Sequence, residues 1–130
     1  MAYILIIEDD EPLREVLAST LTHAGHSVYQ AVEGRQGCGL VASHPTNLVL
    51  TDLIMPGQEG IETIIELRGR YPNLPIIAMS GAAHHGKFYR EVALKLGARR
   101  VLAKPFTAPE LLHAVTEALG VKDPGSPAAT

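Results

Sequence analysis

The chain carries five short segments that have the character of β-strands. They are Tyr3–Ile7, Ser27–Ala31, Leu48–Asp52, Pro75–Met79 and Val101–Ala103. The first and third segments are apolar without alternation, which is typical of strands buried on both faces of a parallel sheet. Polar or turn-forming residues follow the segments, so each one predicts a strand of about five residues.

Helical periodicity fills the intervals between these strands. After the first strand, Pro12 fits a first helical turn, apolar residues recur on one face, and Gly25 ends the helix. Further helices are predicted over Glu33–Ser43, from Ile61 to Tyr71–Pro72, from Phe88 to Gly97, and after a capping box at Thr107–Glu110. The alternation predicts an α/β fold, a doubly wound parallel sheet with helices on both faces.

The second of these helices is predicted to be the weakest. Gly34, Gly37 and Gly39 each lower helix stability by up to about 1 kcal/mol relative to alanine. We therefore expect this helix to be short or mobile.

The composition is that of an ordinary globular domain. A chain of 130 residues, 46% hydrophobic and 19% charged, fits one domain with a sizeable core. It has no apolar run long enough to span a bilayer, and its single cysteine, Cys38, excludes an internal disulfide. The first residues lead us to expect no signal peptide. We expect a cytoplasmic protein without a membrane partner, with a domain over residues 1–121 and a flexible tail over 122–130.

Charge is unevenly distributed along the chain. The net charge of −3 argues against general nucleic-acid binding, and we expect no direct contact with DNA. Between His84 and Lys104, however, one acid, Glu91, is outnumbered by basic residues. These are Lys87, Arg90, Lys95, Arg99, Arg100 and Lys104. Such a run is most often a solvated face, and the alternative is a docking surface for an acidic partner.

Polar residues stand at the carboxyl ends of four predicted strands. They are Glu8, Asp9 and Asp10 after the first, Asp52 in the third, Ser80 after the fourth and Lys104 after the fifth. Taken singly, they can be helix caps, turn residues or a surface lysine. Open α/β sheets bind ligands at this edge, however, and crowded carboxylates need a cation such as Mg²⁺. A lysine and a hydroxyl beside them supply what a phosphoryl group needs.

Four segments carry a family resemblance. They are Ile4–Arg14, Leu50–Gly57, Ala78–Gly81 and Ala103–Phe106. In this order they resemble the signature segments of two-component response-regulator receiver domains, and the resemblance extends to about Val121. It implies a flavodoxin-like (βα)5 fold with strand order 2-1-3-4-5. It also implies a phosphoacceptor switch that uses Mg²⁺, with no enzymatic output beyond its own phosphorylation and dephosphorylation.

The resemblance implies roles for individual residues. Asp52 is the expected phosphoacceptor, attacking a phosphohistidine of a sensor histidine kinase or of a histidine phosphotransfer protein. The expected Mg²⁺ ligands are Asp9, Glu8, Asp52 and the backbone carbonyl of Ile54. The expected phosphoryl-binding groups are Ser80, the backbone N–H of Gly81 and Lys104. The Lys104–Pro105 bond is expected to be cis. The fourth helix, fifth strand and fifth helix are expected to contact a downstream protein or a second copy of the chain.

Some positions depart from the family pattern. Family members usually carry Phe or Tyr three residues before the lysine of the fifth strand, where this chain has Val101, so the aromatic switch is expected to be weakened or replaced. Arg99 and Arg100 stand where acids are common. The residues two beyond the phosphoacceptor and the switch serine are Ile54 and Ala82. Neither can orient an attacking water, which predicts slow self-dephosphorylation.

Other interpretations stay open beside a stand-alone phosphorelay receiver. The chain could be a receiver from a longer protein. It could be a receiver fold that acts by protein interaction without phosphorylation, which Val101 mildly favours. An aspartyl phosphohydrolase would want a second acid where Ile54 stands. A flavodoxin-like electron carrier would want a hydroxyl-rich phosphate loop where the three acids stand.

Overall fold

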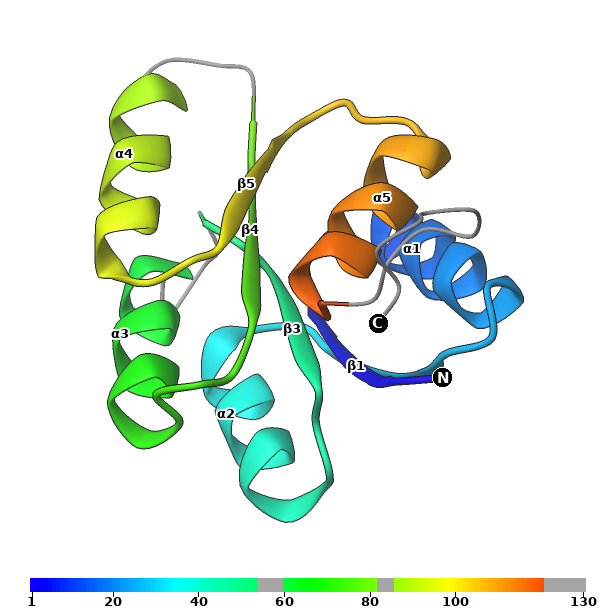
Figure 1. Cartoon of the computed structure of the whole chain (residues 1–130), viewed down its shortest axis with the longest axis horizontal. Coiled ribbons are helices and arrows are strands. Elements are labelled where there is room, and N and C mark those ends of the chain that lie inside the picture. The colour runs from blue at the N-terminus through cyan, green and yellow to red at the C-terminus, as the bar shows by residue number, and fades with distance from the viewer. Residues whose placement is uncertain (54–59, 82–85, 121–130) are drawn as a thin grey trace.

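In the computed structural model, one parallel sheet separates two layers of helices (Figure 1), and the structure describes residues 1–53, 60–81 and 86–120. The strands are β1 (Tyr3–Ile7), β2 (Ser27–Ala31), β3 (Leu48–Asp52), β4 (Ile76–Ser80) and β5 (Arg100–Ala103). The helices are α1 (Glu11–His23), α2 (Gly34–Ser43), α3 (Gly60–Arg70), α4 (Gly86–Leu96) and α5 (Ala108–Ala118). The predicted alternation of strands and helices is confirmed.

The strand order is β2-β1-β3-β4-β5, with every neighbouring pair parallel, as the resemblance implied. The register pairs Ile7 with Thr51 and Ser80 with Ala103. Because parallel strands end at the same edge, the residues that follow β1, β3, β4 and β5 come together there. Sheet order is therefore what assembles the candidate site from segments far apart in the sequence.

Each face of the sheet has its own hydrophobic core. In Figure 1, α1 and α5 lie on one side of the sheet and α2, α3 and α4 on the other. The α1–α5 side buries Ile4, Ile6, Leu17, Leu21, Leu50, Met79, Leu111 and Val115, among others. The opposite side buries Leu5, Ile7, Val41, Val49, Ile64, Leu67, Ala78 and Ala93, among others. Burial from both sides explains why the first and third strands are apolar without alternation.

Helix α2 is the shortest of the five described helices, at ten residues, which agrees with the prediction that it is short. Its mobility stays a prediction. Gly37 is buried against β1, and a Cβ atom at this position would overlap the side chain of Ile7. A Cβ atom at Gly39, by contrast, would meet nothing within 4 Å. One glycine is thus needed for the approach of α2 to the sheet, and the other is not.

Side-chain caps fix the starts of the helices beside the site. Asp10 caps α1, accepting a hydrogen bond from the Leu13 N–H at 3.2 Å. The predicted capping box of α5 is confirmed: Thr107 accepts from the Glu110 N–H, and Glu110 accepts from the Thr107 N–H. Such caps satisfy N–H groups that a helix leaves without partners.

Within the described residues, we find no helix that is both long and apolar enough to cross a bilayer.

The basic run divides among several structural roles. Arg99 donates to the Ala118 carbonyl at 2.6 Å, and Arg100 pairs with Glu117 at 2.8 Å, so both bind α5. Lys104 lies at the sheet edge with the acids. Arg90 and Lys95 are exposed on α4, which the solvated-face interpretation and the docking-surface alternative both require, so both stay open.

Candidate functional site

Three carboxylates meet at the carboxyl edge of the sheet. One oxygen from each of Glu8, Asp9 and Asp52 lies within 4.8 Å of the others. Glu8 and Asp9 follow β1, while Asp52 ends the neighbouring strand β3. Glu8 is 1% exposed and Asp52 is 8% exposed, whereas Asp9 faces solvent. This acid group, defined as Glu8, Asp9 and Asp52, brings together the side chains expected to bind a cation.

Lys104 connects two members of the acid group. Its Nζ lies 2.8 Å from Oε1 of Glu8 and 3.3 Å from Oδ2 of Asp52. The lysine backbone N–H also donates to the Ser80 carbonyl at 2.7 Å, which extends the β4–β5 pairing to the site. The peptide bond from Lys104 to Pro105 is cis. The ammonium is therefore placed where it compensates both buried carboxylates.

Burial and charge act on the pKa values of this pair. Burial raises the pKa of Glu8, and the charge of Asp52 adds to that rise, while hydrogen bonds from Lys104 and the Asp10 N–H oppose it. Burial alone would lower the pKa of Lys104, but the hydrogen bond to Glu8 and the charges of Asp52 and Glu8 outweigh it and raise that pKa. The ammonium thus stays charged at neutral pH beside crowded carboxylates.

The acid loop after β1 is held from several directions. Oε2 of Glu8 accepts from the Asp10 N–H at 3.1 Å, and the Glu8 N–H donates to the Ala31 carbonyl at 3.1 Å. Arg14 donates from Nη1 to the Glu8 carbonyl at 2.9 Å and from Nε to Gln30 at 3.3 Å. The role of Arg14 was not predicted. Its place one turn into α1 was a usable signal, because helical side chains lean toward the helix N-terminus.

The backbone at Asp52 is held with little freedom. Its Oδ1 accepts from the Leu53 N–H at 2.8 Å, and the Thr51 hydroxyl donates to the Asp52 carbonyl at 3.0 Å. A Cβ atom on Gly60 would overlap that same carbonyl oxygen, and the Gly60 N–H donates to the Leu53 carbonyl at 3.1 Å. Glycine is therefore required where α3 begins against the segment that carries Asp52. The role of Gly60 was not predicted, although glycine at a helix start was a visible signal.

The remaining predicted residues fall into three groups. Ser80 ends β4 and is 7% exposed, with its hydroxyl 3.3 Å from the Gly81 carbonyl; Gly81 is exposed. Val101 is half-buried on β5 and packs against the core of the α2–α4 side. Ile54 lies outside the described residues. So do Ala82 and the predicted tail.

Comparison with known proteins gives a family match over most of the chain. The response regulator receiver domain family matches residues 4–116. The response regulator protein FleR of Pseudomonas aeruginosa is 38% identical over 127 residues, which cover 96% of this chain and 26% of FleR. The chain thus spans about a quarter of the length of this curated relative.

Solved structures agree with this match. The receiver domain of NtrX from Brucella abortus has a TM-score of 0.85 at 26% identity, covering 92% of this chain and 99% of that domain. The receiver domain of the sensor histidine kinase PA1611 from Pseudomonas aeruginosa has a TM-score of 0.82 at 28% identity, covering 92% and 98%. Its crystal structure has a magnesium ion coordinated in the active-site cleft. With the family match, the sheet order and the acid group in agreement, the chain belongs to the response regulator receiver domain family.

Proposed function

We propose that this receiver domain is a phosphoacceptor switch in which Asp52 takes a phosphoryl group in the presence of Mg²⁺. The observation that carries the proposal is the position of Lys104, which contacts both Glu8 and Asp52 inside the acid group. A buried carboxylate beside a fixed cation and further oxygen ligands is suited to phosphoryl transfer, which depends on positioning and charge neutralisation.

The donor set of the acid group fits Mg²⁺. Hard divalent cations take oxygen ligands, and three carboxylates within 4.8 Å of one another provide them. Glu8, Asp9 and Asp52 would hold the ion together with the backbone carbonyl of Ile54. When bound, Mg²⁺ neutralises negative charge on the carboxylates and on the phosphoryl oxygens. The magnesium ion in the PA1611 receiver domain supports this assignment.

The phosphoryl donor would be a phosphohistidine of a sensor histidine kinase or of a phosphotransfer protein. A carboxylate oxygen of Asp52 attacks phosphorus and forms the new O–P bond. The P–N bond breaks, and its electron pair returns to the imidazole of the donor, which is then neutral or protonated. Lys104, already 3.3 Å from Asp52, is placed to pair with the phosphoryl oxygens as charge arrives.

The response to phosphorylation would run through Ser80 and Lys104. The Ser80 hydroxyl is 3.3 Å from the Gly81 carbonyl, an interaction that it can exchange for a phosphoryl oxygen. Such an exchange would move the end of β4, and the Gly81 N–H would provide a second donor. Lys104 joins the same movement to β5, because its N–H donates to the Ser80 carbonyl.

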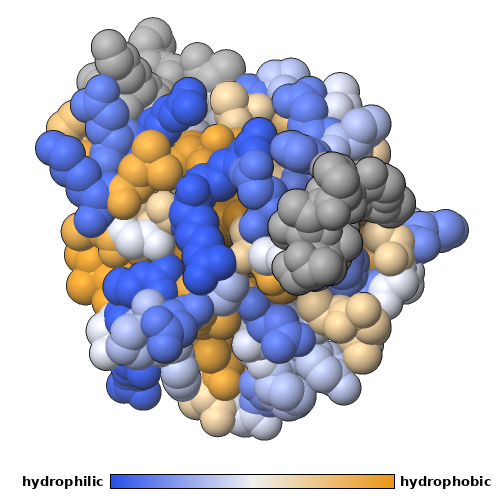
Figure 2. Space-filling model, viewed as in Figure 1, coloured by the Kyte–Doolittle hydropathy of each residue, from blue (hydrophilic) through white to orange (hydrophobic). Residues whose placement is uncertain are grey.

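The output surface would include α4, β5 and α5. Figure 2 shows hydrophobic surface on the side of the molecule where α3 and α4 lie. Among the described side chains of these two helices, the large exposed apolar ones are Ile65 on α3 and Phe88 and Leu94 on α4. Apolar surface on this side supports contact with a downstream protein or with a second copy of the chain.

The test is the intact mass of the protein after incubation with acetyl phosphate, with Mg²⁺ or with EDTA. We expect one added phosphoryl group that requires Mg²⁺ and is absent in Asp52→Asn. Asp10→Asn is the matched control, since Asp10 is an acid of the same loop that caps α1 and asparagine also caps helices. It should be phosphorylated like the wild type.

Failure has a defined meaning in this experiment. If no phosphoryl group is added while circular dichroism shows a folded protein, the chain is a receiver-fold interaction module that works without phosphorylation. If the mass is added, its decay after removal of the donor tests the prediction of slow self-dephosphorylation. A half-life of seconds would contradict that prediction.

A further inference from the structure

A cavity of about 470 Å³ lies at the sheet edge opposite the acid group. Five of its lining residues directly precede strands: Ala2 before β1, His26 before β2, Asn47 before β3, Pro75 before β4 and Arg99 before β5. Met1 and residues at the end of α5 complete the wall. The volume is within the range of about 300–1,000 Å³ that is usual for small-molecule sites.

The hydrogen bonds of three polar side chains leave donors at this cavity. Nδ1 of His26 accepts from the Ala2 N–H at 3.1 Å, so the neutral ring carries its proton on Nε2. Oδ1 of Asn47 accepts from the Tyr3 N–H at 2.8 Å, so its NH₂ group is the remaining polar function. Arg99 uses Nη1 on the Ala118 carbonyl, and its guanidinium has further N–H groups.

The charge around these donors is positive. Neither Asp nor Glu is among the described residues that line the cavity, while Arg99 contributes a cation. Burial lowers the pKa of His26, and the N-terminal ammonium lowers it further, which shows that positive charge already acts on this ring. Pro75, Ala118 and Leu119 add apolar wall. Donors, positive charge and a partly apolar lining together select an anion that has a compact apolar part.

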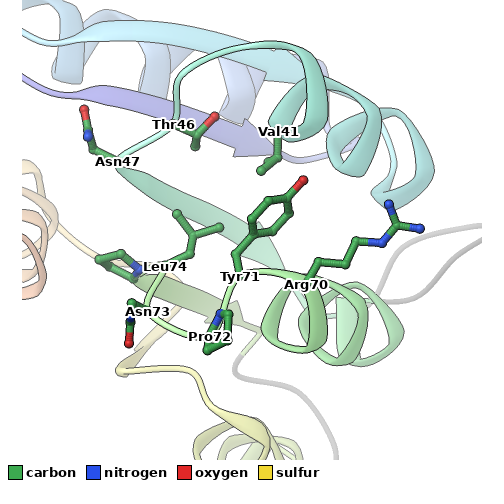
Figure 3. Close-up of a pocket in the computed structure, with 9 residues that line it drawn as sticks. Val41, Thr46, Asn47, Arg70, Tyr71, Pro72, Asn73 and Leu74 are labelled. Atoms are coloured by element: carbon green, nitrogen blue, oxygen red, sulfur yellow. The ribbon is translucent and has the colours of Figure 1, made fainter.

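A larger cavity of about 600 Å³ near the same edge lacks this combination (Figure 3). The Tyr71 side chain extends toward Val41 there, whereas Arg70, which is exposed, points away from Thr46 and Asn47. The Thr46 hydroxyl donates to the His44 carbonyl. Arg70 is the one charged side chain among the described residues that line it, and because it points away from Thr46 and Asn47 the cation and the polar groups do not converge, so we assign no ligand class to it.

We propose that the 470 Å³ cavity binds a small organic oxyanion, whose carboxylate or phosphate group is held by His26, Asn47 and Arg99. The apolar part of the ligand packs against Pro75 and Leu119. The site uses none of the residues assigned to phosphorylation, so a ligand can bind whether or not Asp52 is modified.

The experiment is an NMR titration of the histidine rings of the full chain at matched ionic strength. The probes are sodium phosphate, sodium acetate and sodium 3-methylbutanoate, with sodium chloride as the reference. An anion about 4 Å from the ring raises the pKa of His26 by about half a unit or more at saturation. His23 on α1 and His113 on α5 are both exposed and serve as internal controls expected to shift little.

The probes distinguish the two sources of the oxyanion. A response to phosphate above that to acetate indicates a phosphate group, and a response to 3-methylbutanoate above both indicates an apolar carboxylate. Either result supports the site. A His26 shift no larger than that of His23 with all three probes overturns the proposal.

Two variants test the donor geometry. Asn47→Asp keeps the oxygen that accepts from Tyr3 but replaces the NH₂ donor by a second oxygen, so it should abolish the response. Arg99→Gln should raise the dissociation constant about tenfold, the usual effect of losing a charged partner at a partly exposed site. An unchanged response in Asn47→Asp contradicts the proposal. Phosphorylation of Asp52, measured in the same variants, should be unaffected, which separates this result from the proposed function.

Discussion

Replacing Lys104 by methionine should destabilise the metal-free protein, because the lysine is the cation that compensates two buried carboxylates. Methionine keeps much of the apolar stem and removes only the ammonium. Glu8 is 1% exposed, and its carboxylate would then face Asp52 without a cation. Removing one partner from a buried ion pair leaves an uncompensated charge, which destabilises proteins far more than removal of the whole pair.

The magnitude follows from the two distances. At an effective dielectric constant of about 20, the ammonium attracts Glu8 at 2.8 Å by about 6 kcal/mol and Asp52 at 3.3 Å by about 5 kcal/mol. The substitution recovers only the desolvation of the ammonium, by several kcal/mol, and about 2 kcal/mol of lysine side-chain entropy, and these offset much of the sum. We expect the free energy of unfolding to fall by about 2–4 kcal/mol at pH 7.

Urea denaturation followed by circular dichroism measures this loss in EDTA and in Mg²⁺. The same substitution in a Glu8→Gln background should lower the free energy of unfolding by only about half as much, because one of its two partners is then neutral. In Mg²⁺ the loss should shrink, since the bound cation supplies the missing positive charge and stabilises the folded state. Lys95→Met, at an exposed position of α4, is the matched control and should change stability by less than about 0.5 kcal/mol.

Two results would refute this reasoning. A loss below about 0.5 kcal/mol in EDTA would mean that Lys104 contributes no more than a surface charge. An equal loss with and without the Glu8 carboxylate would mean that the 2.8 Å contact carries no coupling energy.

Three further sets of substitutions test other contacts by urea denaturation. Gly39→Ala should raise the free energy of unfolding by about 0.5–1 kcal/mol. Gly37→Ala should lower it by about 1–3 kcal/mol, because a methyl group at position 37 meets Ile7. Equal effects of the two substitutions would contradict the packing argument. Arg68→Met should lower it by about 2–3 kcal/mol, since the guanidinium donates to three carbonyls at the ends of α3 and α4; a loss within about 0.5 kcal/mol would contradict this. Because the folded state lowers the pKa of His26, the neutral ring contributes stability that is complete above the ordinary pKa of 6.5 and is lost as pH falls through the folded-state pKa. His26→Asn should therefore flatten the dependence of the free energy of unfolding on pH in that range. An unchanged pH profile would exclude this contribution.

The fold could be predicted because its strongest signals are local. Strands buried on both faces are apolar without alternation, and this signal placed β1 and β3 at the bounds that the structure has. The ends of β4, β5 and α4 moved by one or two residues, as is usual where several residues at an element end are equally compatible. The hydrophobic pattern predicts only that strands and helices alternate along the chain. The order of the strands in the sheet was predicted from the family resemblance.

The composition of the site could also be predicted, but its internal pairing could not. Parallel strands end together, so polar residues at strand ends had to meet at one edge. Which of two carboxylates lies closer to Lys104 depends on side-chain geometry, and the structure places Glu8 nearer than Asp52. Arg14 and Gly60 each had a local signal, an arginine one turn into α1 and a glycine at a helix start, but that signal does not name the contact partner. Their contacts with the Glu8 and Asp52 carbonyls depend on how the elements pack.

Helix α2 shows where an argument from propensity reaches its limit. Intrinsic propensity gives Gly37 and Gly39 the same penalty, because it measures only the backbone freedom that each glycine loses on folding. Packing separates them: Gly37 lies against Ile7 of β1, and a side chain at Gly39 would meet nothing. At Gly37 the absence of a side chain lets α2 approach β1, and β1 ends in the loop that carries Glu8 and Asp9. Gly37 therefore weakens its own helix and yet contributes to the position of the acid group. This contribution depends on the contact of Gly37 in α2 with Ile7 in β1, two elements that are far apart in the sequence.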